Sequence, residues 1–230
     1  RVTAEWMING YMNEDLFSLD IKRFQKFHSS KKFIMERVTE TLGDLYGMHW
    51  PYKQHNTSRN QRLLPYHEEL KKAGACFGVS GEYERPMWYE LNSAKAEYKY
   101  SFDYQNWYPS VEFETKNTIT NVGLYELSPF SKYEIKGELA HSELQRICTA
   151  NIKNEVGRST YTQMLNKAGG IETDLTIICI DKNHFRIISS ASTRTHDKAH
   201  IVKHISSHLE FRDITDDLIC LGIFGPKSRN

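Results

Sequence analysis

The stretch YTQMLNKAGGIETDLTIICI, residues 161–180, decides how the chain folds. Two apolar-patterned runs flank a Lys-Ala-Gly-Gly tetrapeptide, which predicts two antiparallel strands joined by a turn. In the second run, Asp174 shares one strand face with Ile178 and Ile180. Aspartate is depleted in strands, and a mixed face of this kind is typical of a pocket wall. An acid near the exposed end of a strand is the alternative explanation, and the pattern alone leaves both open.

Outward from this hairpin, residues from about 119 onward predict an α+β fold, an antiparallel sheet with flanking helices. The evidence is an alternation of strand periodicity with helical periodicity. Further strands are predicted within 122–127, 132–137, 185–191 and 217–225, and helices within 137–150 and 197–209. In the first of these helices, Ala140, Leu144, Ile147 and Cys148 fall on one face.

The segments before residue 119 follow different patterns. Residues 29–47 predict an amphipathic helix, with Ser30 capping its start and Gly47 at its end. Because residues 1–60 have no strand partner of their own, we interpret them as an appendage to a larger protein. Residues 61–112 look irregular and rich in aromatic rings. A base-stacking platform is conceivable there, but interspersed acids favour a connector held by buried rings.

Composition narrows the function classes. Lys plus Arg number 30 and Asp plus Glu 29, a balance that argues against a nucleic-acid surface. The apolar runs are too short to cross a bilayer, so we predict no membrane partner. The four cysteines have no CxxC spacing and are interpreted as reduced core thiols, which predicts an intracellular protein.

Four histidines recur at steps of four: His196, His200, His204 and His208. Imidazoles at this spacing on a helix can share a metal. The helical angle places them away from the apolar residues at 201, 205 and 209, with His208 nearest the apolar edge. We therefore predict a solvated helix face and no physiological metal site.

The residues that frame the hairpin carry a family resemblance. GLYELSPFSKYEIKG and NEVGRSTYTQMLNKAGGIETDLTI resemble the folate-binding aminomethyltransferase domain of the glycine cleavage system. They resemble still more the form fused to an FAD-dependent oxidoreductase in dimethylglycine and sarcosine dehydrogenases. AEWMINGYMNEDLFSLDIKRF, at residues 4–24, resembles the segment that closes the oxidoreductase part of those enzymes. LGIFGPKSR resembles the Gly-Pro-x-Ser-Arg strand end of the family.

The resemblance implies roles for particular residues. It places Asp174 beside the reactive nitrogens of tetrahydrofolate, as the catalytic carboxylate. Tyr161 would line the folate pocket, and Phe130, Ile178 and Ile188 would form apolar walls around the pterin. Ser190 stands where the aminomethyltransferases usually have Asn, so its side chain is the weakest match of the folate-binding set. No metal ligand is implied.

The resemblance also implies a domain division and a parent enzyme. Residues 1–60 would end an FAD-dependent oxidoreductase part, and 61–230 would begin the folate-binding domain. We expect a middle fragment, which starts after the glycine-rich FAD segment and stops before the glutamate that grips the pterin. Its partners would then be the missing FAD domain, the rest of the folate domain, a methylated amine and folate.

The parent would oxidise an N-methyl amine at FAD and pass the one-carbon unit to tetrahydrofolate, while the isolated fragment would be inactive. Its compartment would be the cytoplasm, or the mitochondrial matrix in a eukaryote. One alternative is a non-catalytic homologue similar to the pyruvate dehydrogenase phosphatase regulatory subunit. Another is an aminomethyltransferase or demethylase that uses folate without flavin.

Overall fold

The computed structural model describes residues 1–10, 16–91 and 95–229 of the chain. Contacts divide the chain into two compact units. The first, here called the sheet unit, combines residues 1–25 with 130–218. The second, here called the mixed unit, combines residues 26–129 with 219–230.

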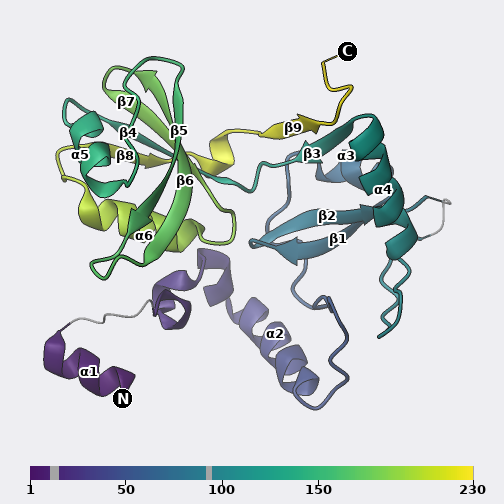
Figure 1. Cartoon of the computed structure of the whole chain (residues 1–230). Helices are drawn as coiled ribbons and strands as arrows, with labels where there is room; N and C mark the ends of the chain where they lie inside the picture. Colours follow the sequence, from purple (N-terminus) through teal and green to yellow (C-terminus); the bar gives the residue numbers. More distant parts are fainter. Residues whose placement is uncertain (11–15, 92–94, 230) are drawn as a thin grey trace. The chain divides into compact units, whose positions relative to one another are not determined.

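A five-stranded antiparallel sheet organises the sheet unit, in the order β5-β6-β7-β4-β8 (Figure 1). The strands are β4 Ser131–Lys136, β5 Ser159–Leu165, β6 Ile171–Asp181, β7 His184–Ser189 and β8 Glu210–Asp213. The predicted hairpin at residues 161–180 is present as β5 and β6. Its turn is organised by Asn166, whose Oδ1 accepts hydrogen bonds from the backbone N–H groups of Ala168 (3.0 Å) and Gly170 (2.9 Å). Gly169 has φ of 84°, a conformation that glycine adopts without strain.

One face of this sheet forms the core. Leu175, Ile177, Phe185 and Ile187 are at most 2 % exposed, and they alternate along β6 and β7 with less buried residues. Helices α5 Ala140–Ile147 and α6 Arg194–His204 contribute buried residues to the same cluster. The core therefore lies between the sheet and these two helices.

The described residues in the N-terminal part of the sheet unit include short helical elements. These are α1 Val2–Asn9 and the 3₁₀ helices η1 Phe17–Leu19 and η2 Ile21–Arg23. A further 3₁₀ helix, η4 Thr215–Asp217, follows β8.

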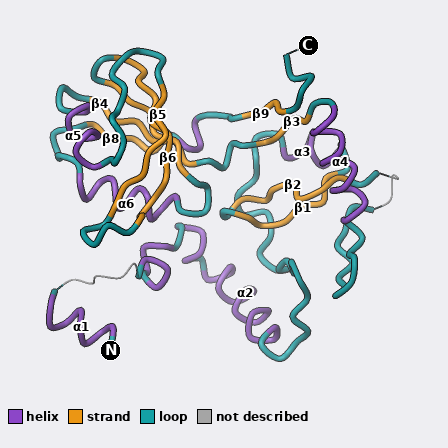
Figure 2. Tube along the Cα trace, in the orientation of Figure 1, coloured by secondary structure: helices purple, strands orange, loops and turns teal. Residues whose placement is uncertain are grey.

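The mixed unit holds smaller elements, which can be followed in Figure 2. Its helices are η3 Lys26–Ser29, α2 Lys31–Asp44, α3 His67–Lys72 and α4 Tyr108–Thr120. Its strands form two antiparallel pairs, β1 Ala75–Ser80 with β2 Tyr83–Tyr89 and β3 Gly123–Glu126 with β9 Leu221–Phe224. Ser30 caps α2 as predicted, since the N–H of Phe33 donates to its Oγ at 3.2 Å. The helix ends at Asp44, before the predicted Gly47.

Two predictions from the sequence fail here. Residues 61–112 are not simply irregular, because β1 and β2 form a hairpin within them. Its two turn residues, Gly81 and Glu82, have φ of 57° and 69°, which matches a type I′ turn. The density of aromatic residues concealed this turn signal. Strand β8 was also missed, because four residues are too few to show a periodicity.

The predicted fold class is confirmed: the chain is α+β with antiparallel sheets and flanking helices. All four cysteines are free, and burial raises the pKa of Cys76 to about 11 and of Cys148 to about 12. These two thiols are therefore poor nucleophiles at neutral pH. Within the described residues, no helix is long and apolar enough to cross a membrane.

Candidate functional site

The face of the five-stranded sheet opposite the core carries all the strand residues that the sequence singled out. Strand register arranges them in rows, since directly paired residues project to the same face. Tyr161 pairs with Thr176, and Thr176 with Ile188 on the next strand. Ile178 lies one position further along the same face of β6. We call this surface the open face, because α5 and α6 pack their buried residues against the other side.

Asp174 and Tyr161 are in direct contact on the open face. The Tyr161 hydroxyl donates a hydrogen bond to Asp174 Oδ2 at 3.0 Å. The contact is diagonal, because Asp174 pairs directly with Gln163 while Tyr161 pairs with the next open-face residue. Both side chains are exposed, Tyr161 by 63 %. The tyrosine fixes one carboxylate oxygen, and no described residue forms a hydrogen bond with the other, Oδ1.

Apolar groups adjoin this polar pair. Ile178 and Ile188 are half-buried on the open face. Phe130 and Ser190 lie just beyond the strands, next to Ser131 and Ser189, which pair with each other. Ser189 also pairs with Leu175, the neighbour of Asp174. The register therefore brings the start of β4, the end of β7 and this part of β6 together. The Ser190 side chain contacts Ser192 at 2.9 Å. The six residues therefore gather at one region of the sheet unit.

Sequence reasoning missed a charged cluster on the same face. Glu134 on β4 accepts a hydrogen bond from Arg186 Nη2 at 2.7 Å, and its other oxygen lies 3.2 Å from His184 Nε2. Burial alone would raise the pKa of Glu134, but the Arg186 hydrogen bond and the neighbouring His184 bring that pKa below its usual value. The signal was available, because Lys132, Glu134 and Lys136 alternate strictly with core residues.

The histidine stripe differs from the prediction. His196 and His200 directly precede the fully buried Asp197 and Ile201, so the stripe borders the buried face of α6. The two ring nitrogens of His196 lie 3.1 Å from Asp197 Oδ1 and 3.2 Å from Glu172 Oε2. Burial, and then the nearby His204, lower the pKa of His200. His208 lies beyond the end of the helix and is exposed, contrary to its predicted place at the apolar edge.

The open face fits a folate better than a flavin. A carboxylate held by a tyrosine beside isoleucines offers a fixed polar group next to an apolar wall, which suits a planar heterocycle with a reactive nitrogen. For FAD, the sequence carries no Gly-x-Gly-x-x-Gly loop to approach a pyrophosphate. The chemistry of the open face is therefore compatible with a folate, and the sequence contains no dinucleotide fingerprint.

The fold is that of an aminomethyltransferase-type domain. The crystal structure of the glycine cleavage system aminomethyltransferase T from Bartonella henselae matches this chain with a TM-score of 0.59. The match covers 73 % of this chain and 41 % of that one, at 23 % sequence identity. Residues 66–230 match the GCVT N-terminal domain, and residues 9–63 match the FAD dependent oxidoreductase central domain. The chain belongs to the GCVT N-terminal domain family.

Curated relatives resemble the chain over nearly its whole length. The 4-methylaminobutanoate oxidase (formaldehyde-forming) of Paenarthrobacter nicotinovorans is 36 % identical, over 98 % of this chain and 28 % of its own length. The mitochondrial pyruvate dehydrogenase phosphatase regulatory subunit of Mus musculus is 31 % identical, over 99 % of this chain and 27 % of its own length. The mitochondrial dimethylglycine dehydrogenase of Rattus norvegicus is 27 % identical, over 100 % of this chain and 27 % of its own length. The chain spans less than a third of the length of these relatives. The predicted family resemblance is confirmed.

Proposed function

We propose that this chain is the central part of a flavin- and folate-dependent dehydrogenase of N-methyl amines, which transfers the released one-carbon unit to tetrahydrofolate. Two consecutive family matches, to an FAD dependent oxidoreductase central domain and then to a GCVT N-terminal domain, support this assignment. Relatives named for oxidising methylated amines match this chain across both of these regions. In this proposal residues 1–60 end the oxidoreductase part and residues 61–230 begin the folate-binding domain.

The observation that carries the proposal is the hydrogen bond of 3.0 Å between Tyr161 and Asp174 Oδ2. Tetrahydrofolate, when bound, supplies the amine nitrogen that takes up the one-carbon unit. As that nitrogen forms its new bond to carbon it must lose a proton, and in this proposal Asp174 Oδ1 accepts that proton as a general base. Tyr161 holds the carboxylate in one orientation through Oδ2. Ile178, Ile188 and Phe130 provide the apolar wall, while Ser190 contributes at the strand end.

Proton transfer at Asp174 requires a protected setting. A carboxylate on an exposed sheet face is solvated, and a solvated base is a weaker partner for a bound amine. In the proposed enzyme, the bound folate and the rest of the folate-binding domain would cover the open face and exclude water from Asp174. The one-carbon unit and its acceptor are then held together at high effective concentration.

A non-catalytic regulatory homologue is the second candidate. The mouse phosphatase regulatory subunit is more similar to this chain, at 31 % identity, than rat dimethylglycine dehydrogenase, at 27 %. Sequence similarity therefore does not separate an enzyme from a regulator. An aminomethyltransferase without flavin is less well supported, because residues 9–63 match an FAD dependent oxidoreductase domain.

The test uses the full-length protein that contains this chain. It is incubated with a panel of N-methylated amino acids, with and without tetrahydrofolate, while an artificial dye records electron transfer. The proposal predicts amine oxidation in both conditions, with free formaldehyde as the product only when tetrahydrofolate is absent. Formaldehyde release that tetrahydrofolate leaves unchanged would contradict the folate role. Absence of any oxidation, with a flavin-free protein, would favour the regulatory homologue.

A further inference from the structure

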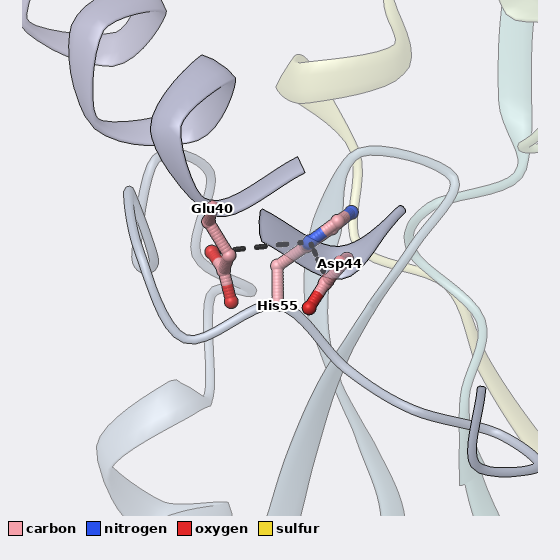
Figure 3. A group of neighbouring side chains, drawn as sticks. All are labelled: Glu40, Asp44 and His55. Atoms are coloured by element: carbon pink, nitrogen blue, oxygen red, sulfur yellow. Dashed lines mark ion pairs between the residues drawn. The ribbon is translucent and has the colours of Figure 1, made fainter. Parts of the chain in front are cut away.

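A second group of chemically active side chains lies in the mixed unit, away from the open-face residues in sequence. Glu40 and Asp44 are one turn apart on α2, and His55 follows in the loop after the helix. One ligand atom from each of the three lies within 4.8 Å of the other two. Figure 3 shows both carboxylates beside the imidazole ring.

The distances at His55 are too long for hydrogen bonds. Its Nδ1 lies 3.8 Å from Glu40 Oε2 and 3.9 Å from Asp44 Oδ2, beyond the usual range for N–H···O contacts. The Nδ1 atom is buried, and no described residue forms a hydrogen bond with it. A buried ring nitrogen that faces two carboxylates across such a gap could share an ion or a water molecule with them.

Other contacts hold the two carboxylates in place. Burial would raise the pKa of Glu40, but the N–H of Asn56 and the hydroxyl and N–H of Thr57 donate to it, and together with His55 they lower that pKa to about 2. Asp44 Oδ1 is paired with Lys53 Nζ at 2.5 Å, so Oδ2 is the oxygen that faces His55. The ligand set therefore has two oriented carboxylate oxygens and one imidazole nitrogen.

A cavity of about 200 Å³ adjoins this set. Asp44 and His55 line it, together with His49 and Lys53. This space is large enough for several water molecules. An ion between the three side chains would thus have room for solvent ligands on its cavity side.

We propose that Glu40, Asp44 and His55 bind one divalent transition-metal ion of the Zn²⁺ type, with water completing its coordination from the cavity. The imidazole nitrogen favours such an ion over Mg²⁺ or Ca²⁺, which take oxygen ligands. Bonds of about 2.0–2.2 Å to each ligand require the three side chains to close by only a few tenths of an ångström. The ion would tie the end of α2 to the loop at residues 55–57. The sequence predicted no metal site and did not single out Glu40, Asp44 or His55.

The test treats the 230-residue chain with a chelator, removes the chelator, and then titrates the chain with Zn²⁺ in a calorimeter. The wild-type chain is expected to bind one high-affinity ion. Substitution His55→Gln should weaken that binding by at least about tenfold, since even loss of an outer partner of a metal ligand costs about 10–100-fold. The matched control is His49→Gln, which alters another cavity histidine outside the ligand set and should leave the affinity unchanged. Circular dichroism verifies that both variants fold.

A second measurement keeps the proposal falsifiable if His55→Gln does not fold. Asp44→Asn should also weaken Zn²⁺ binding. Hydrogen exchange at the N–H groups of Asn56 and Thr57, which donate to Glu40, should slow when Zn²⁺ is added to the wild-type chain. One contrary result is that the folded variant, His55→Gln or Asp44→Asn, binds Zn²⁺ as tightly as the wild type. Another is that His49→Gln loses as much Zn²⁺ affinity as the ligand variants. These results would mean that Zn²⁺ binds adventitiously at the surface or that only water fills the cluster. Either result would overturn the proposal.

Discussion

The five-stranded sheet and helix α2 both carry apolar residues at regular spacing, but only the sheet buries them. Phe185 and Ile187 on β7 are fully buried between the sheet and its two helices. On α2, Ile34, Val38 and Leu42 recur at helical spacing and remain 45–56 % exposed. The same kind of pattern therefore predicts which element forms in both regions, and it says nothing about whether a partner for the apolar face lies within the chain.

The two candidate sites differ in the same way as these two regions. The Tyr161–Asp174 pair lies on a sheet whose other face packs against the core. A rigid sheet of this kind holds its side chains in fixed positions. The Glu40, Asp44 and His55 set stands on a helix without buried residues and depends on polar contacts with the following loop. Three substitutions sharpen this contrast.

The largest expected effect on stability is in the sheet. Phe185→Ala should lower the free energy of unfolding by about 3–5 kcal/mol, because it leaves a cavity in a close-packed core. Urea denaturation of the 230-residue chain, followed by circular dichroism, measures the change. A loss below about 1 kcal/mol, the range of ordinary surface positions, would show that this face is not the core.

An intermediate effect on the free energy of unfolding is expected at Glu40, which is held by polar contacts and not by a packed core. Its pKa is lowered to about 2, so its contribution is complete above the ordinary value of 4.5 and disappears as pH falls toward about 2. The shift of about 2.5 pKa units corresponds to about 3.5 kcal/mol at about 1.4 kcal/mol per unit, and solvent screening reduces this value. In chelator-treated buffer at pH 7, Glu40→Gln should therefore cost on the order of 1–3 kcal/mol. Urea midpoints measured from pH 7 to pH 2 should converge between wild type and variant. A difference that is independent of pH would contradict the role given to the charge.

The smallest effect is expected on the exposed face of α2. Leu42→Ala removes a side chain that is 56 % exposed and replaces it with a good helix former. The free energy of unfolding should change by no more than about 0.5 kcal/mol in the 230-residue chain. A loss comparable to that of Phe185→Ala would show that α2 is packed in solution, and the contrast between the two regions would fail.

Local patterns explain how much could be predicted from the sequence. The hairpin at 161–180, the helix with Ala140 and Leu144, and the Ser30 cap all depend on neighbours within a few residues. The place of β4 between β7 and β8 could not be read this way, because it pairs segments far apart in the chain. The sequence named Asp174 and Tyr161 but could not predict their hydrogen bond, because the register of the hairpin decides which side chains meet. The division between residues 60 and 61 stays a prediction, and so do the roles of Asp174, Tyr161, Phe130, Ile178, Ile188 and Ser190.

The central claim is that Asp174 serves one-carbon transfer and not amine oxidation, and one assay tests it directly. Asp174→Asn is introduced into the full-length protein, and both products are measured in the presence of tetrahydrofolate. The matched control is Asp181→Asn, an exposed acid at the other end of β6. Loss of a general base should reduce methylene-tetrahydrofolate formation by about 10²–10⁴-fold. Amine oxidation should persist, with free formaldehyde in place of the folate product, while Asp181→Asn behaves as wild type. An unchanged product ratio in Asp174→Asn, or an equal loss of both activities, would contradict the account.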